Sequence, residues 1–286
     1  MSNICKNFLT CFHNNHEKLE NKIKVKKALL IGINYENTNY ELNGCINDTL
    51  NLNNFLIKNH FFINDEIIIM NDNKKEELYP NKKNILFQLN QLHEFSKKNK
   101  DKIVQFFISF SGHGYHQIDE NGDESNGYDE VLCPIDFLHN GYIIDDYIKK
   151  EFIDKLNYNV SCVCLMDCCH SGTIMDLKYN YKLNKNKFIY SKSKNIRTKC
   201  NIVMISGCRD NQTSSDALLI DKNKEYQFQG ALTSSFINSF EYNINYKDLI
   251  IKIRENIKKY NFDQLPQLSS GKKLKLNDIF LISEYN

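Results

Sequence analysis

Residues 103–114 have the sequence IVQFFISFSGHG, and residues 160–172 have the sequence VSCVCLMDCCHSG. Each is an apolar run of strand length that ends in a glycine-containing motif, which predicts a buried parallel strand followed by a tight turn. A helical pattern at 145–156 separates the two runs, so we expect adjacent parallel strands. Ligands bind beyond the carboxyl ends of the strands in open α/β sheets, which is where His113 and Cys169 would lie.

The alternation of strand and helix patterns continues along the chain. Strand patterns occur at 26–34, 66–72, 102–110, 160–167, 201–207 and 278–282. Helical patterns occur at 44–60, 81–98, 145–156, 230–242 and 246–260. This order predicts an α/β fold, a sandwich with a mostly parallel six-stranded sheet and helices on both faces.

Length and composition exclude several classes of protein. A chain of 286 residues can bury about 75% of its unfolded surface in a core. The net charge of +2 creates no field for nucleic acid or anionic membrane, and no apolar run approaches the ~18 residues of a membrane span. Ten cysteines without a signal-peptide pattern indicate reduced thiols in the cytoplasm. A monomer is expected.

The motifs SGHG (111–114) and DCCHSG (167–172) together resemble the paired signature of the metacaspases, caspase-like cysteine peptidases of plants, fungi and protists. Other blocks resemble the family in the family's order: KALLIGINY (27–35), LNGCINDT (42–49), NGYDEVLCPID (126–136), IIDD (143–146), ISGCRDNQTSSDA (205–217), GALTSSF (230–236) and PQLSS (266–270). The resemblance covers about residues 26–285. It implies a caspase-like αβα fold of the type I arrangement without a long prodomain.

The two motifs supply the residue types of a cysteine-histidine dyad. A thiol attacks a peptide carbonyl as the thiolate, which a neighbouring imidazole stabilises. We expect Cys169 to be the nucleophile and His113 its base, because the following HSG aligns with Cys169. Cys168 would then point to the opposite face of the strand, and His170 would be structural. By analogy with the family, the backbone N–H groups of Gly114 and Cys169 are expected to form an oxyanion hole.

The resemblance also implies a first specificity pocket, lined by Cys45, Asp48, Ser111 and Asp167. Two carboxylates in a narrow cleft select a cation, arginine through paired hydrogen bonds and lysine as a point charge. Protein or peptide substrates are therefore expected to be cleaved after Arg or Lys. Two structural alternatives stay open. Asp48 fits a helix N-terminal acid, and Asp167 fits a hydrogen-bonded acid at a strand end.

A calcium site is implied by four acids that match the family, Asp129, Asp145, Asp146 and Asp176. Calcium takes six to eight oxygen ligands, and it would activate the protein without joining the chemistry. Asp145 and Asp146 also begin the predicted helix at 145–156, where acids are favoured without a metal. The stretch DENGDESNGYDE (119–130) lacks the sixth-position glycine of an EF-hand loop and is expected to be an accessory acidic loop.

These patterns divide the chain into a polar extension (1–25), a large catalytic region (26–177), a linker (178–199) and a small region (200–286) of the same domain. The linker carries eight Lys or Arg residues and no acid, and it is expected to be an exposed loop. Tethered beside a pocket for basic residues, it is an expected site of self-cleavage.

The same residues allow three other interpretations. A catalytically idle caspase-fold scaffold is the main alternative, since a fold does not guarantee an activity. A zinc site from Cys168, Cys169, His170 and either Cys162 or Cys164 fails on spacing, because structural zinc sites use CxxC pairs. Cys5 and Cys11 could accept palmitate, but Ser2 stands where a myristoylation signal needs glycine.

Overall fold

The computed structural model describes residues 23–119, 127–169, 172–184, 187–207, 216–220, 226–262 and 264–285. Several residues singled out from the sequence lie outside these ranges, namely Ser2, Cys5, Cys11, His170 and 120–126 of the acidic stretch. Within the described ranges, no helix has the length and apolar character of a membrane span.

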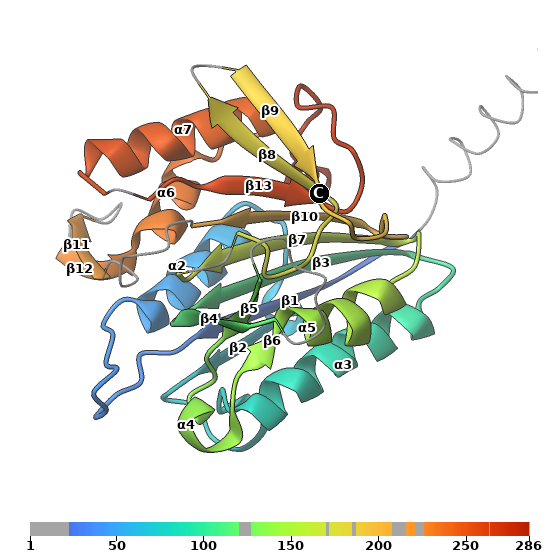
Figure 1. Cartoon of the computed structure of the whole chain (residues 1–286). Helices are drawn as coiled ribbons and strands as arrows, with labels where there is room; N and C mark the ends of the chain where they lie inside the picture. The colour runs from blue at the N-terminus through green and yellow to red at the C-terminus, as the bar shows by residue number, and fades with distance from the viewer. Residues whose placement is uncertain are drawn as a thin grey trace, which may run out of the picture.

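An eight-stranded sheet forms the centre of the molecule, with strand order β2-β1-β3-β7-β10-β13-β8-β9 (Figure 1). The five parallel neighbours are β2 (Ile67–Asn71), β1 (Lys24–Gly32), β3 (Ile103–Ser111), β7 (Val160–Asp167) and β10 (Asn201–Ser206). Antiparallel pairing adds β13 (Gln267–Ser270), β8 (Tyr179–Asn184) and β9 (Lys187–Lys192). The α/β class and the mostly parallel sheet are confirmed, but the sheet has eight strands where the sequence predicted six.

The sixth predicted strand, at 278–282, is wrong. This segment forms one isolated bridge, Asn245 with Ile279, and leads into a 3₁₀ turn at Leu281–Tyr285. Its apolar character has another cause, because Phe280 and Ile282 are fully buried in the core beneath the helices. The strand beside β10 is β13, whose four residues are too short to give a clear pattern.

The predicted linker loop contains the hairpin β8–β9, which extends the sheet beyond β13. Tyr179, Tyr181 and Leu183 alternate with polar residues, which is the period-two pattern of a half-buried strand. Tyr181 is 3% exposed, and its hydroxyl accepts a hydrogen bond from the Leu274 N–H at 2.7 Å. The basic residues of the segment obscured this alternation in the sequence.

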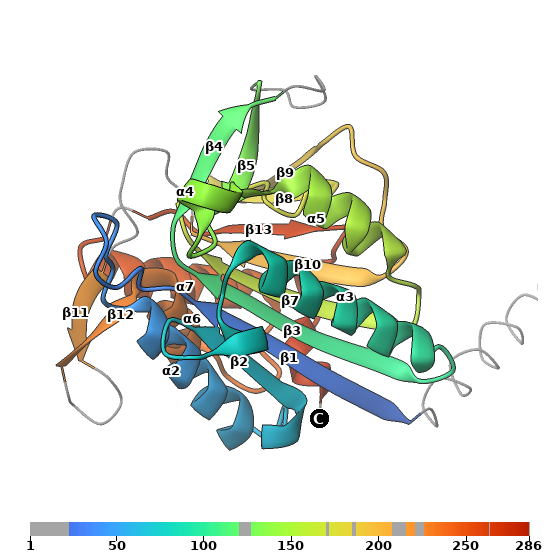
Figure 2. The same cartoon turned by 90° about the horizontal axis from the view of Figure 1, so that it is seen from below.

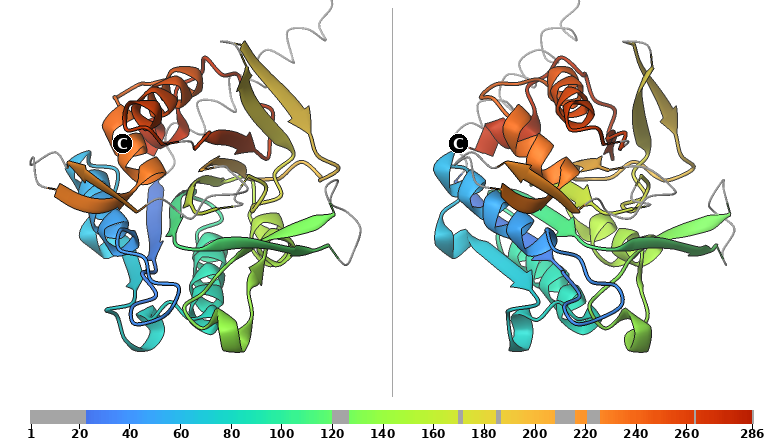
Figure 3. Two further views of the ribbon diagram at one scale, coloured as in Figure 1. Left: turned by 60° about the vertical axis from the view of Figure 1, so that its left-hand side comes forward. Right: turned by 90° about the vertical axis from the view of Figure 1, so that its left-hand side faces the viewer.

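Helices cover both faces of the sheet (Figures 2 and 3). One face carries α2 (Cys45–Lys58), α6 (Ala231–Ser239) and α7 (Tyr246–Lys259). The other carries α3 (Lys82–Lys98) and α5 (Asp145–Glu151), and α4 (Phe137–Asn140) is a single turn. Further 3₁₀ turns lie at Asn64–Glu66, Glu76–Leu78 and Ile153–Lys155. All five predicted helices are present, and the one at 145–156 ends early and continues as a 3₁₀ turn.

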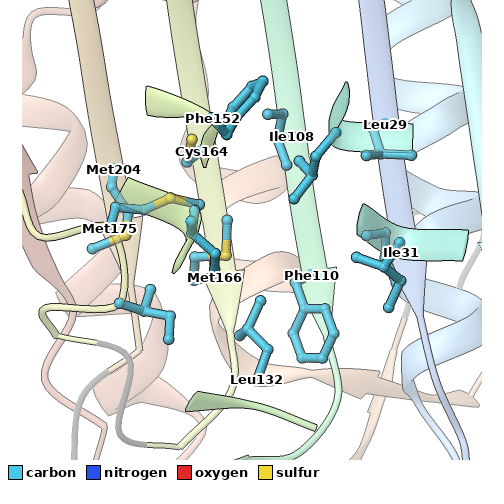
Figure 4. Close-up of a cluster of buried hydrophobic side chains, with 14 of the residues drawn as sticks. Leu29, Ile31, Ile108, Phe110, Leu132, Phe152, Cys164, Met166, Met175 and Met204 are labelled. Carbon is cyan, nitrogen blue, oxygen red and sulfur yellow. The ribbon is translucent and has the colours of Figure 1, made fainter. Parts of the chain in front are cut away.

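Two hydrophobic cores separate the layers, because alternate side chains of a strand point to opposite faces. On β3, Phe106 and Phe110 pack on the α3/α5 side, and Phe107 packs on the α2/α6 side. Figure 4 shows the first core, where Cys164 and Met166 of β7 lie opposite Ile108 and Phe110 of β3. Burial of each large apolar side chain contributes about 1.5–3 kcal/mol.

Two small sheets complete the fold, both attached to segments quoted above. The first consists of β4 (Gly114–Ile118), β5 (Tyr128–Leu132) and β6 (Ile143–Ile144), and it begins directly at the SGHG motif. The second pairs β11 (Asp216–Ile220) with β12 (Tyr226–Gly230), and β12 leads directly into α6.

Candidate active site

The two motifs meet at the carboxyl edge of the sheet. Ser111, the last residue of β3, pairs with Asp167, the last residue of β7. His113 and Cys169 therefore follow paired residues by the same number of positions. The Gly112 N–H donates to the Asp167 carbonyl at 3.4 Å, which extends the contact past the strand ends. The tertiary structure places the motifs side by side, as their spacing predicted.

Gly114 brings the backbones of the two motifs into direct contact. A Cβ at this position would lie 2.1 Å from the carbonyl oxygen of Cys169 and 3.3 Å from Sγ of Cys168. Only glycine permits this approach. Cys168 is 2% exposed and belongs to the core, whereas Cys169 is half-buried. The cysteine that the sequence marked as nucleophile is therefore the more accessible of the pair.

A main-chain carbonyl determines the proton position on His113. The ring atom Nε2 lies 2.8 Å from the carbonyl oxygen of Tyr40. A carbonyl oxygen only accepts, so the neutral imidazole carries its hydrogen on Nε2 and leaves the Nδ1 lone pair available as a base. The loop that presents Tyr40 contains two non-glycine residues in the left-handed region, Tyr35 (φ 53°) and Asn37 (φ 62°). Such residues are uncommon and concentrate at functional sites.

Tyr35 contacts both the backbone and the ring of His113. Its hydroxyl accepts a hydrogen bond from the His113 backbone N–H at 2.9 Å and donates one to the Cys133 carbonyl at 2.6 Å. The Tyr35 and His113 ring centroids are 4.8 Å apart. Burial raises the pKa of Tyr35 well above its ordinary value, so the hydroxyl keeps the proton that it donates.

The role of Tyr35 was missed in the sequence. Its only signal was its position at the end of KALLIGINY, directly beyond the first strand. The side chain is 1% exposed, and nothing in the linear sequence relates it to His113 or Cys133.

The two acids of the expected specificity pocket converge on one point. Asp48 lies in the first turn of α2, Asp167 ends β7, and they are 1% and 2% exposed. Asp48 Oδ1 accepts from the Gly230 N–H at 2.9 Å, and Asp167 Oδ2 accepts from the Thr233 N–H at 2.8 Å. Both structural alternatives are thus present: Asp48 is a first-turn acid, and Asp167 is a hydrogen-bonded strand-end acid.

The other two expected pocket residues are also buried. Cys45 and Ser111 are each 2% exposed. Cys45 begins α2, and a Cβ on Gly32, the last residue of β1, would lie 2.1 Å from the Cys45 carbonyl oxygen. The absence of a side chain at Gly32 lets the first turn of α2 approach the sheet edge beside Asp48.

Three of the four expected calcium ligands come together. Single ligand oxygens of Asp145, Asp146 and Asp176 all lie within 4.8 Å of one another. Asp145 accepts from the N–H groups of Glu130 (2.8 Å) and Asp146 (2.9 Å). Oxygen-only donors of this charge suit a hard cation, so the set fits calcium.

Asp129, the fourth expected ligand, is not in that group. It is 5% exposed on β5, and its Oδ2 accepts from Gln117 Nε2 at 3.3 Å. Asp176 has a φ of 45°, a conformation that non-glycine residues seldom adopt.

The zinc alternative finds no support. Cys162 and Cys164 are fully buried, and their Sγ atoms lie 3.7 Å apart. Burial raises the pKa of Cys162 well above its ordinary value, which favours a neutral thiol over the thiolate that zinc binds. In the described part of the chain, the possible metal-binding group consists of aspartates only.

Comparisons with known proteins agree with this arrangement. Residues 26–178 match the family model described as metacaspase, peptidase C14 domain. Metacaspase-1 of Plasmodium falciparum is 35% identical, over 89% of this chain and 41% of its own length. Metacaspase-1A of Neurospora crassa is 31% identical, over 90% and 65%. Metacaspase-1 of Pyricularia oryzae is 30% identical, over 90% and 74%.

The chain thus spans less than two thirds of the first two of these relatives. A solved crystal structure of a Geobacter sulfurreducens protein superposes with a TM-score of 0.57, covering 87% of this chain and 94% of that chain. At 22% identity this likeness concerns the fold alone. With a family model that matches more than half of the chain and relatives aligned along about nine tenths of it, this protein belongs to the metacaspase family.

Proposed function

We propose that this chain is a calcium-dependent cysteine endopeptidase that cleaves after Arg or Lys, with Cys169 as nucleophile and His113 as base. The single observation that carries the proposal is the meeting of SGHG and DCC at paired strand ends, with Nε2 of His113 engaged by the Tyr40 carbonyl. Family membership supports a peptidase. We also propose a reducing, cytoplasmic location and a monomer.

In the proposed reaction, Nδ1 of His113 takes the thiol proton of Cys169, and the thiolate attacks the scissile carbonyl carbon. The Gly114 and Cys169 N–H groups bind the developing oxyanion, each contributing about 3–4 kcal/mol. The imidazolium, stabilised by the Tyr40 carbonyl, protonates the leaving amine. Water then attacks the thioester, His113 takes a proton from that water, and the free carboxylate leaves Cys169.

The proposed specificity for Arg or Lys rests on the Asp48–Asp167 pair, together with Cys45 and Ser111 as walls. A cation between two buried carboxylates gains strongly because little water competes there. An aspartate substrate would meet like charge.

The proposed calcium ligands are Asp145, Asp146 and Asp176. Asp129, which lies on β5 outside this group, is proposed as a further ligand. Calcium would neutralise the repulsion among these converging carboxylates. Asp145 also holds the Glu130 N–H, and the Glu130 carboxylate accepts from the Thr173 N–H at 2.6 Å. This route connects the acids to the segment that follows DCCHSG.

We also propose a large region (26–177) and a small region (200–286) separated by a linker (178–199) that the enzyme cleaves itself. A peptidase cleaves an unpaired, extended backbone. The backbones of β8 and β9 are paired by inter-strand hydrogen bonds, which protect these two strands from cleavage. Lys194, Arg197 and Lys199 are exposed beyond β9. These three positions are the proposed cleavage sites.

Peptides ending in Arg, Lys or Asp before a fluorogenic group test the proposal. The unaltered protein should hydrolyse the Arg and Lys peptides and leave the Asp peptide intact. Cys169→Ala should lower kcat by about 10⁴-fold or more, because it removes the nucleophile. Cys168→Ala, which removes only a buried thiol, should keep most of the activity. Loss of activity in Cys168→Ala with retention in Cys169→Ala would overturn the assignment.

Tyr35→Phe tests the support of the imidazole. Loss of the hydroxyl leaves the partly buried His113 N–H without its acceptor, a cost of about 1–3 kcal/mol. If loss of this hydrogen bond misplaces the His113 imidazole in the transition state, kcat should fall by about tenfold or more while KM stays within twofold. Tyr181→Phe is the matched control, since it removes a similar hydrogen bond remote from the site. Equal kcat values in the two variants would contradict the positioning role.

Chelation tests the cation. A calcium chelator should abolish activity, and added calcium should restore it. Asp145→Ala combined with Asp146→Ala should reproduce chelation, because two of the three converging carboxylates are lost. The exposed Asp101→Ala serves as a charge control and should respond to calcium normally. Full activity in chelator would refute the calcium requirement.

Mass spectrometry of calcium-treated protein tests self-cleavage. New termini are expected after Lys194, Arg197 or Lys199, and not within the paired residues of β8 and β9. The two fragments should stay associated, because β10 remains hydrogen-bonded to β7. Cys169→Ala should remain intact. Identical termini in that variant, or no termini between 178 and 199, would exclude self-cleavage there.

A further inference from the structure

Gly230 lies directly beside the two carboxylates of the proposed specificity pocket. A Cβ on this residue would lie 2.2 Å from Asp167 Oδ2 and 2.5 Å from Asp48 Oδ2. Both oxygens therefore approach one point beside the Gly230 backbone. The main chain at the start of α6 occupies a place where no side chain fits.

The backbone conformation of Gly230 does not explain why glycine is there. Its φ of −66° and ψ of 134° are open to any residue. The requirement is space, because every other side chain would collide with both Asp48 and Asp167. The glycine that begins GALTSSF is therefore required because it leaves room for the two carboxylates, and not because it forms a turn.

The start of α6 also supplies what two close carboxylates need. Like charges a few ångströms apart in a buried position repel strongly. The Gly230 N–H binds Asp48 and the Thr233 N–H binds Asp167, one donor for each acid. Thr233 lies in the first turn of the nine-residue helix α6, and Gly230 is the residue directly before that helix, whose amino end carries partial positive charge. The helix start therefore offsets the repulsion and keeps the pair together.

A second contact ties the same segments together. The Asn47 side-chain amide donates to the Phe228 carbonyl of β12 at 3.0 Å, next to the bond between Asp48 and Gly230. Consecutive residues of α2 thus hold the end of β12. The position of Asp48 depends on a segment some 180 residues away in the chain.

We propose that Gly230 is a positioning residue for specificity, which holds Asp48 and Asp167 as a converging charged pair through the main chain at the junction of β12 and α6. Asp48 and Asp167 come from the large region, and the element that sets their geometry comes from the small region. The inference rests on the proposed function, since it assigns the control of substrate charge selection to Gly230. Loss of the contact should weaken the recognition of a cationic side chain without altering Cys169 itself.

The test compares two peptides that differ in charge alone, one ending in Arg and one in its neutral isostere citrulline. The unaltered protein should prefer Arg. In Gly230→Ala the ratio of kcat/KM for Arg over citrulline should fall by at least about tenfold, mainly through KM, because the displaced acids no longer pair with the guanidinium. The rate at which iodoacetamide, a small neutral reagent, alkylates Cys169 should stay within twofold.

Gly207→Ala is the matched control, because a Cβ there meets no atom of the described residues nearer than 3.5 Å. It should leave the Arg-to-citrulline ratio unchanged. Asn47→Ala is a milder variant that removes the side-chain bond to β12 and keeps the protein foldable should Gly230→Ala unfold. It should lower the ratio by about two- to fivefold, which corresponds to one partly exposed hydrogen bond.

The outcomes separate the two proposals. An unaltered protein that does not distinguish Arg from citrulline overturns both the specificity and the role of Gly230. A protein that prefers Arg, with the same preference in folded Gly230→Ala and in Asn47→Ala, overturns the role of Gly230 alone. A fall in the alkylation rate equal to the fall in kcat/KM would show general damage to the active site, and it too would overturn the inference.

Discussion

The parallel pairing of β3 with β7 is the constraint on which the rest of the site depends. Its register sets Ser111 opposite Asp167, so the residues that follow each strand, His113 and Cys169, emerge at the same edge. Slippage by one position would turn every side chain of the shifted strand to the other face and break both cores. The hydrophobic packing that holds the sheet therefore also brings the two residues of the proposed dyad to one edge, where further hydrogen bonds position the His113 ring.

The immediate environment of the proposed dyad consists largely of main-chain groups. The Tyr40 carbonyl engages His113, Gly114 packs on the Cys169 carbonyl, and Tyr35 bridges two backbone groups. The acids follow the same rule, since Asp48 accepts from the backbone N–H of Gly230 at the end of β12 and Asp167 accepts from that of Thr233 in α6. Backbone groups are fixed once the fold is formed, so they can hold polar side chains without the rotamer entropy of another side chain.

Several features were predictable, and the failures have identifiable reasons. Long periodic segments such as α3 and α7 were found because their apolar stripe repeats many times. The strand prediction for residues 278–282 was wrong because a short apolar run has the same composition whether it forms a strand or fills a core. The hairpin β8–β9 was missed because its alternation of apolar and polar residues is weak and several of its polar residues are lysines. Of the four expected calcium ligands, Asp145, Asp146 and Asp176 converge, and Asp129 stays a prediction.

The sequence by itself determined the fold class, the family signature and the two residues of the proposed dyad, because those depend on local periodicity and on short motifs. Only the tertiary structure decided which groups touch those residues. Tyr35 and His113, or Asp48 and Gly230, are distant in the chain and meet because parallel strands and crossing helices bring their ends to one edge. Such contacts arise from packing in three dimensions, and a linear pattern carries no record of the distance between two side chains.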